Sequence, residues 1–464
     1  MNRPIRWYDY ITININWFAL TTRSQTLAPL VIPLLVQRFV GEAQKGSYVG
    51  TLRLWTLMAA LLSQALIGML SDHTSTRWGR RKPFIFLGAL FEIIVVLSIG
   101  FTAVLEGLTG YRVFFLLIML SMVGSNTAHA ATQALIPDLV PDEKKGIFSG
   151  IKAALELPVP LIFVSFVIAK QLADGNLWGG LVSLAVVLSL CMLVTMFAPH
   201  ESAVEALPAL DWRPFLRLVA MTGAFTVLIL GMGALVKWIL GFTSATLLVG
   251  LVGLVAMVCA VLIGVWMSIR ISFGPEIRKH RSFVWWVVNR LAFMVAATNL
   301  AGFMVFFLQE KFPELAGEKA AGPAATIVMF VGIFILLMAI PSGWLADRFG
   351  KVKLIALAGM LVTAGVVFVV SAPDMTLLYV GGSIVGAGVG LFYSANWALG
   401  TEIVPRNQAG RFLGIQNLAG AGAGAVGAYI GGTIADNMSF VLLMSIYGAM
   451  ALLSVLPLLG IRQK

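Results

Sequence analysis

Ionisable side chains inside long apolar runs are the first residues of this sequence that could do chemistry. Arg23, Lys152 and Glu156 each stand within a mainly apolar stretch. A charge inside a membrane-spanning helix costs roughly 2.5 to 3.5 kcal/mol on insertion scales, so each needs a partner, water or a function. Arg23 could bind a solute, pair with a membrane carboxylate or bridge two helices. Lys152 and Glu156 are four residues apart and could pair with each other, whereas Glu92 suggests only a buried hydrogen bond.

Uncharged polar residues form a second group of candidates. Asn126, His129 and Gln133 recur at spacings of three and four, so on a helix they share one face. A single buried histidine is more often a satisfied hydrogen-bonding residue than a proton carrier, but three polar groups on one stripe favour a cavity wall. Asn396 and Trp397 offer hydrogen bonds and a stacking face, although Trp397 could equally be a packing residue. Such a surface suits hydroxyl-rich solutes.

The composition indicates which elements hold these residues. Of 464 residues, 59% are hydrophobic and 11% charged, whereas a soluble domain has about 25% charged residues. A bilayer core needs about 20 apolar residues per helix, and about fourteen such runs occur. The expected spans are 12–36, 49–71, 84–105, 112–136, 147–169, 177–198, 215–236, 242–269, 284–308, 324–346, 354–372, 376–401, 411–435 and 439–460.

Charge placement predicts the topology. Lys and Arg concentrate in alternate loops, which predicts an even number of spans and both termini in the cytoplasm. We expect the chain in the cytoplasmic (inner) membrane, without a removable signal peptide. The net charge of +11 comes from cations scattered over short loops rather than grouped with stacking aromatics, so a nucleic-acid partner is not expected.

No enzyme site stands out in the sequence. Cys191 and Cys259 lie in apolar runs, without a second cysteine or a histidine cluster nearby, so neither a disulfide nor a metal site is expected. There is no ATP-binding loop and no nucleophile–base set. We therefore expect neither an enzyme nor a cofactor.

An internal repeat predicts the architecture. Asp138-Leu-Val-Pro141 followed by Gly146 matches Glu402-Ile-Val-Pro405 followed by Gly410. Each copy follows the fourth span of a six-span block, and two further spans separate the blocks. Duplicated halves are how many secondary transporters build a central site between two rocking bundles. We expect an N-terminal bundle at 1–198, a linker with two extra spans at 199–283, and a C-terminal bundle at 284–464.

A second repeated motif combines glycine, acid and basic residues after the second span of each block. It reads Gly68, Asp72, Gly79, Arg80, Arg81 in the first half, and Gly343, Asp347, Arg348, Gly350, Lys351 in weaker form in the second. Glycine lets helices approach closely, and a carboxylate can pair with guanidinium groups at a helix end. We expect Asp72 to pair with Arg80 or Arg81, and Asp347 with Arg348. A simple positive-inside anchor would not require the repeated Gly and Asp. The expected cytoplasmic gate comprises Gly68, Asp72, Gly79, Arg80, Arg81, Asp138, Gly343, Asp347, Arg348, Glu402 and Arg411.

With this motif the sequence resembles the major facilitator superfamily. The stretch from Ser71 to Ile85 is similar to its sucrose/proton symporters and glycoside-pentoside-hexuronide symporters. The resemblance implies an all-α membrane fold of two six-helix bundles, to which this chain adds a two-helix insertion. It also implies a monomeric secondary transporter that moves a small polar solute, a sugar or glycoside, by H⁺- or Na⁺-coupled alternating access.

The resemblance also directs attention to the first and fourth helices of each half, which line the cavity in this superfamily. The implied substrate-binding residues are Arg23, Asn126, His129, Gln133, Arg290, Asn299, Asn396 and Trp397. The sucrose branch carries an Asp in helix four, but no acid occurs between Arg112 and Pro137 here. Coupling would then fall to Glu156 or His129. The alternatives are an exporter of amphiphilic compounds and a non-transporting assembly factor for a pigment or membrane complex, which would need no polar stripes.

Overall fold

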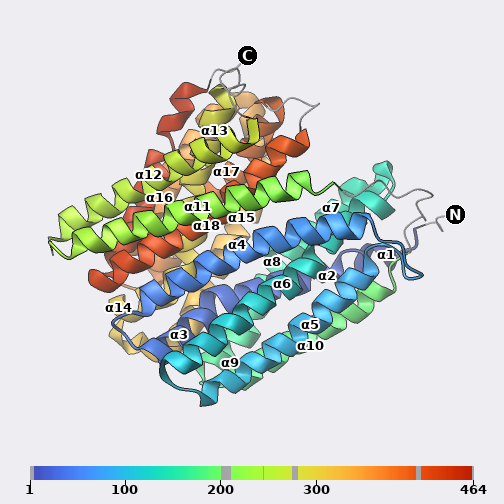
Figure 1. Ribbon diagram of the computed structural model, residues 1–464, viewed down its shortest axis with the longest axis horizontal. Helices are drawn as coiled ribbons and strands as arrows, with labels where there is room; N and C mark the ends of the chain where they lie inside the picture. The colour runs from blue at the N-terminus through green and yellow to red at the C-terminus, as the bar shows by residue number, and fades with distance from the viewer. Residues whose placement is uncertain (1–4, 200–210, 244, 274–280, 404–408, 462–464) are drawn as a thin grey trace. The chain divides into compact units, whose positions relative to one another are not determined.

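The computed structural model of the chain describes residues 5–199, 211–243, 245–273, 281–403 and 409–461 (Figure 1). Within these residues every regular element is a helix, as the sequence predicts. Twelve of the described helical segments are long and apolar enough to cross a membrane. The chain is therefore an all-α, multi-pass membrane protein.

Two further helical segments account for the remaining expected spans. The first, 12–36, is divided into α2 (Ile15–Thr26), a π-helical turn (Leu27–Val31) and α3 (Ile32–Val40). Pro29 lies in that turn and, because proline has no backbone N–H, it removes one helical hydrogen bond. The second lies in α18 (Ala409–Asn437), which has 29 residues. A helix of that length extends about 43 Å, more than a bilayer core of about 30 Å.

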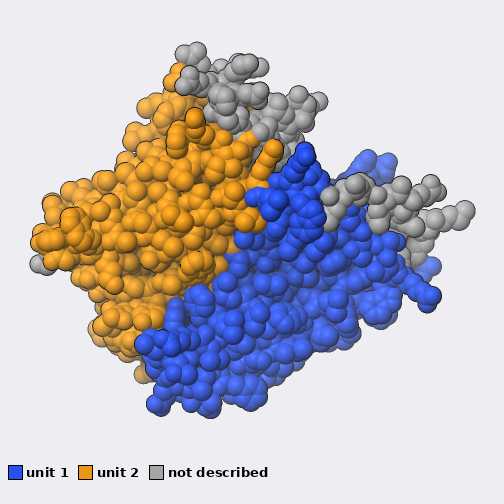
Figure 2. All heavy atoms as spheres, in the orientation of Figure 1, with its two compact units in different colours: residues 1–39, 59–216 blue, residues 40–58, 217–464 orange. Residues whose placement is uncertain are grey.

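The chain forms two compact units, which Figure 2 colours separately. Unit 1 holds residues 1–39 and 59–216, and unit 2 holds residues 40–58 and 217–464. Two helices run through these boundaries, α4 (Lys45–Asp72) and α11 (Arg213–Leu240).

Unit 1 is built around close contacts of α5 with α6 and with α10, and α5 and α10 lie side by side in Figure 1. A Cβ added at Gly88 of α5 would lie 2.6 Å from the amide nitrogen of Ala128 and 2.8 Å from the carbonyl oxygen of Gly124, so α5 and α6 meet at their backbones. The further helices of this unit are α1 (Asp9–Thr12), α5 (Lys82–Phe101), α6 (Gly107–Leu139), α7 (Lys145–Glu156), α8 (Pro158–Phe163), α9 (Ala169–Ala173) and α10 (Leu177–Met196).

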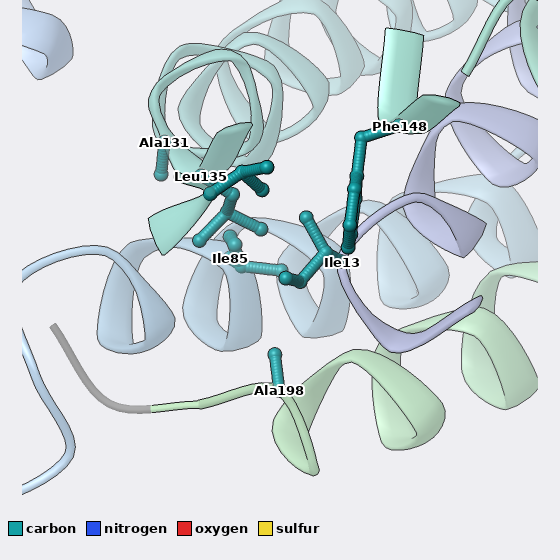
Figure 3. Packing of buried hydrophobic residues seen from close by; sticks show 7 residues of the cluster. Ile13, Ile85, Ala131, Leu135, Phe148 and Ala198 are labelled. Carbon is teal, nitrogen blue, oxygen red and sulfur yellow. The ribbon is translucent and has the colours of Figure 1, made fainter. Parts of the chain in front are cut away.

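One end of unit 1 is closed by an apolar cluster. Figure 3 shows Ile85 of α5, Leu135 of α6 and Phe148 of α7 packed together, all with zero exposure. Tyr10 of α1 stacks on Phe148 with 4.5 Å between ring centroids. This packing fixes the helix ends that carry the charged motif residues of the first half. The full cluster is Ile13, Ile85, Ala131, Leu135, Val140, Phe148 and Ala198.

Unit 2 is organised around a glycine-lined helix, α17, which packs against α15 and α16. Added Cβ atoms at Gly381 and Gly388 would press on the α16 backbone, whereas at Gly386 and Gly390 they would press on α15. Two opposite faces of α17 thus touch neighbouring backbones. The helices of unit 2 are α12 (Thr246–Phe273), α13 (Arg281–Leu300), α14 (Met304–Lys311), α15 (Ala321–Phe349), α16 (Lys351–Ser371), α17 (Met375–Ile403), α18 and α19 (Phe440–Leu453).

The two inserted helices, α11 and α12, also pack within unit 2. Helix α12 contacts α13, α18 and α19. The ring of Phe225 on α11 occupies the space left by the missing side chains of Gly264 on α12 and Gly422 on α18. Small residues therefore seat the insertion on α18.

Candidate functional site

The charged motif of the first half is assembled around Arg81. Its Nε lies 2.9 Å from Asp138 Oδ2 and its Nη2 2.5 Å from Asp72 Oδ1. Its Nη1 donates a 2.6 Å hydrogen bond to Ser71 Oγ, and Arg80 pairs with Asp138 at 3.1 Å. Burial alone would lower the pKa of Arg81, but the hydrogen bonds and charges of Asp138 and Asp72 raise it above its ordinary value. Arg81 stays charged and ties together the ends of α4, α5 and α6.

The second glycine of the motif shapes the same turn in both halves. Gly79 has φ +97° and Gly350 φ +92°, a region that favours glycine. Each stands just before a helix, α5 or α16. The first glycines behave differently, because a Cβ added at Gly68 or Gly343 would meet no described atom within 4 Å. The close helix approach expected at those two positions is therefore not seen in the described part of the chain.

The second half forms a different ion pair from the one expected. Arg348 does not pair with Asp347; its guanidinium lies 5.3 Å from the ring centroid of Trp344, on the same helix. Adjacent residues point in different directions on a helix, which explains why Asp347 and Arg348 do not meet. Instead, Lys351 pairs with Glu402. Arg411 lies on α18, but its side chain is outside the described residues.

Arg23 is the partner of a membrane carboxylate, one of the roles open to it from the sequence. Its Nε lies 2.8 Å from Glu92 Oε1, and the two side chains are 5% and 1% exposed. Ser121 accepts from Arg23 Nη2 and donates to Glu92 Oε1 at 2.7 Å. This pairing of Arg23 on α2 with Glu92 on α5 was not predicted from the sequence. The requirement that a buried charge be compensated could have found it, since both charges lie midway along expected spans.

A second polar cluster of unit 1 joins α2, α6 and α7. The ring of His129 meets the ring of Trp17 edge to face at 5.3 Å between centroids. Lys152 Nζ lies 3.9 Å from the Trp17 ring centroid and 3.4 Å from Glu156 Oε2. The side chains of Lys152 and Glu156 are 30% and 40% exposed. The cluster thus combines a buried indole, an imidazole and a partly exposed ion pair. Its member Trp17 was not predicted from the sequence.

The other residues of the predicted stripe on α6 lie at different depths. Asn126 is buried and donates a 2.8 Å hydrogen bond to the Met122 carbonyl of its own helix. Gln133 is exposed and accepts from Gln64 Nε2 at 3.1 Å. The stripe therefore runs from a buried amide to an accessible one, with His129 between them.

In unit 2, Arg290 and Asn396 meet as neighbouring side chains of α13 and α17. Arg290 Nη1 donates to Asn396 Oδ1 at 2.8 Å, and Asn396 Nδ2 donates to Asn289 Oδ1 at 3.1 Å. Asn289 Nδ2 in turn donates to the Ser454 carbonyl at 2.7 Å. Asn289 was not among the candidates predicted from the sequence, although Asn289 directly precedes Arg290.

The remaining two candidates of unit 2 have separate surroundings. Asn299 is fully buried and donates to the Val295 carbonyl at 2.9 Å, close to Gly427 of α18. Trp397 is 51% exposed. Of the four candidates in this unit, only Arg290 and Asn396 are hydrogen-bonded to each other.

Comparison with known proteins agrees with this architecture. The model of the Major Facilitator Superfamily matches residues 290–463. The sucrose transport protein SUC3 of Arabidopsis thaliana is 26% identical over 177 residues, covering 31% of this chain and 29% of that protein. A putative metabolite transport protein, YwtG of Bacillus subtilis, is 29% identical over 147 residues, covering 32% and 29%. The matched part of the chain thus spans less than a third of these relatives' length.

Solved structures match over nearly the whole chain. A mutant of the nucleoside transporter NupG aligns with a TM-score of 0.68 at 11% identity, covering 98% of this chain and 100% of that one. A D-xylose-proton symporter aligns with a TM-score of 0.63 at 15% identity, covering 98% of both. Each of these proteins is described as a transporter or symporter, and none as an enzyme. The chain therefore has the major facilitator fold and resembles the transporters of that superfamily.

Proposed function

We propose that the chain is a secondary active transporter that moves a small polar solute, a sugar or glycoside, by cation-coupled alternating access. The cluster of Trp17, His129, Lys152 and Glu156 carries this proposal. It places an indole, hydrogen-bonding groups and partly exposed charges within an otherwise apolar bundle. A purely structural protein has no need for accessible polar groups in such a bundle, because each is costly in a membrane.

The class of solute is supported by two kinds of observation. Amide, imidazole and indole groups suit hydroxyl-rich solutes, since they supply directed hydrogen bonds and a stacking face. Sugar transporters are also among the similar proteins, with sucrose and D-xylose in their descriptions. The substrate-binding groups that we propose are Asn126, His129, Gln133, Arg290, Asn299, Asn396 and Trp397, while Arg23 pairs with the buried Glu92.

The coupling ion and the gate complete the proposal. Glu156 carries the coupling proton, because it is a partly exposed carboxylate beside Lys152 whose charge would change on protonation. The ion pairs of Arg81 hold the first-half helix ends closed in one state and separate in another. In this proposal the chain acts as a monomer in the cytoplasmic membrane, with both termini in the cytoplasm.

Uptake into liposomes that contain the purified chain tests the function. Galactose, xylose, sucrose, a methyl glycoside and the acidic sugar galacturonate are supplied with a proton gradient, a sodium gradient or neither. We expect one solute to accumulate only when a cation gradient is present. Trp17→Ala should abolish that uptake, whereas Trp78→Ala, which removes an exposed tryptophan of the same unit, should not. Absence of uptake under every gradient would contradict the function.

A further inference from the structure

Arg290 is a buried cation to which the described residues supply no carboxylate. It stands at the middle of α13, is 9% exposed, and donates a hydrogen bond to the neutral amide of Asn396. Its Nε is buried and has no hydrogen-bond partner among the described residues. A buried charge without a counter-ion is strongly unfavourable. Arg290 therefore has unused donors and an unbalanced charge.

The described part of unit 2 offers no counter-ion near the middle of α13. No Asp or Glu occurs within 217–273, 281–309, 321–346, 351–373, 375–401 or 409–464, apart from Asp436. The described acids of the unit lie in the last turn of a helix or in a connection. They are Glu42, Glu310, Glu314, Glu318, Asp347, Asp374, Glu402 and Asp436.

The hydrogen bonds around Arg290 all run in one direction. Arg290 donates to Asn396, Asn396 donates to Asn289, and Asn289 donates to the Ser454 carbonyl. The Nε1 of Trp286 also donates to the Asn396 carbonyl. The side-chain oxygens of Asn396 and Asn289 each already accept a hydrogen bond, from Arg290 and from Asn396 respectively. The group still required at Arg290 is therefore an acceptor, and the charge of Arg290 selects a negative one.

The other buried arginines show how this differs from a structural role. Arg23 faces Glu92 at 2.8 Å, and Arg81 faces two aspartates. Arg53 of α4, also 9% exposed, has no described carboxylate partner, and its Nη1 is likewise buried without a hydrogen-bond partner among the described residues. It nevertheless donates to the Thr298 carbonyl where α13 ends and lies over the Phe303 ring. Arg53 thus binds a freed helix carbonyl, while Arg290 donates to a side-chain amide, lies 6.0 Å from the Trp286 ring centroid and is near Tyr393.

We propose that Arg290 binds an anionic group of the transported solute, a carboxylate or a phosphate. The planar guanidinium fork matches both groups. The solute of the proposed transporter is then an acidic sugar or glycoside rather than a neutral one. This inference rests on the proposed function only in naming what is transported, because anion binding is measurable without transport.

Thermal unfolding of the purified full chain in detergent tests the site. Sodium chloride is replaced at constant ionic strength by galacturonate or glucose 6-phosphate, with galactose and glucose as the neutral probes. We expect one anion, and neither neutral sugar, to raise the Tm of the wild type. Arg290→Gln should weaken that anion on the order of 30-fold or more, as expected for removal of one partner of a buried charge pair. Arg53→Gln, which removes another buried cation of unit 2, should leave the affinity unchanged.

A second measurement needs no probe. With no anion added, Arg290→Gln should raise the Tm, because it removes an uncompensated charge and keeps a donor for Asn396. A lower Tm would mean that Arg290 is structural and would overturn the proposal. So would stabilisation by neither anion, stabilisation that persists in Arg290→Gln, or equal loss in Arg53→Gln. If Arg290→Gln does not fold, Arg290→Lys tests the anion site alone: lysine keeps the charge but loses the fork, so the anion should stabilise this variant less than the wild type, and equal stabilisation would overturn the proposal.

Uptake measurements distinguish a failure of the anionic-solute inference from a failure of the proposed transport function. Equal uptake of galactose and galacturonate by the wild type would overturn the anionic solute and leave the transporter intact. No uptake of any probe, together with Arg290-dependent anion binding in detergent, would instead reject the transporter and keep the anion site.

Discussion

Arg23 and Glu92 form a buried ion pair that links the first and third spans of unit 1, with 2.8 Å between Nε and Oε1. Their exposed fractions of 5% and 1% leave neither charge a route to water. Removing one partner would leave the other charge buried and unpaired, so the resulting loss of folding stability should be measurable.

Glu92→Leu should destabilise the chain by about 3 to 5 kcal/mol, because it leaves the Arg23 guanidinium buried and unpaired. Combining it with Arg23→Met should recover much of that loss, since no buried charge remains. Unfolding of the purified variants in detergent measures both effects. The matched control is Glu156→Leu, which breaks a partly exposed pair and should cost about 0 to 1 kcal/mol. Equal costs for Glu92→Leu and Glu156→Leu would contradict the prediction.

Asp72→Asn should change the rate of transport much more than the affinity for solute. Asp72 is one of the two carboxylates that hold Arg81, and it lies at the end of α4 rather than among the proposed substrate-binding groups. Uptake kinetics in liposomes at several solute concentrations separate kcat from KM. Asp142→Asn is the control, because it removes the same charge from a side chain that is 89% exposed. An unaltered rate in a correctly inserted Asp72→Asn protein counts against the gate.

Glu156→Gln should keep solute exchange and lose gradient-driven accumulation. Glutamine retains the size of glutamate but cannot gain or lose a proton at neutral pH. Counterflow in liposomes measures exchange, and uptake under an imposed proton gradient measures accumulation. If both persist at wild-type levels, Glu156 is only the structural partner of Lys152.

Gly386→Ala should destabilise unit 2 by about 1 to 3 kcal/mol, because the added methyl group would press on the backbone of Val331. The control is Gly343→Ala, where an added Cβ meets no described atom within 4 Å. There alanine should be neutral or stabilising by about 0.5 to 1 kcal/mol, through its better helix propensity. Unfolding in detergent compares them, and equal effects would argue against backbone contact at Gly386.

The helices of this fold could be predicted because the signal for each is local. Apolar runs of spanning length correspond to described helices, including the one that the π-helical turn at Pro29 interrupts between α2 and α3. The positive φ of Gly79 and Gly350 explains the second glycine of each repeated motif, although the sequence alone suggested only a repeat.

The side-chain partners were harder to predict because they depend on helix rotation and depth. Arg23 and Glu92 are 69 residues apart, and only the general requirement that buried charges be compensated connects their two apolar runs. The expected pairing of Asp347 with Arg348 ignored the fact that neighbours on a helix face different directions. The Lys351–Glu402 pair could not be predicted from the sequence, because only the packing of α16 against α17 brings together these residues, which are 51 positions apart.

The two charged loops give the halves of the duplicated chain different sensitivity to ionic strength. Arg81 is 7% exposed at its side chain and is shared by two carboxylates, whereas the Lys351–Glu402 pair is 18% and 57% exposed. Dissolved ions screen exposed pairs far more than buried ones. The contact of the first half is thus partly shielded from the surrounding electrolyte by the burial of Arg81, whereas the pair of the second half is more open to it. A rise in salt therefore loosens the second-half loop first.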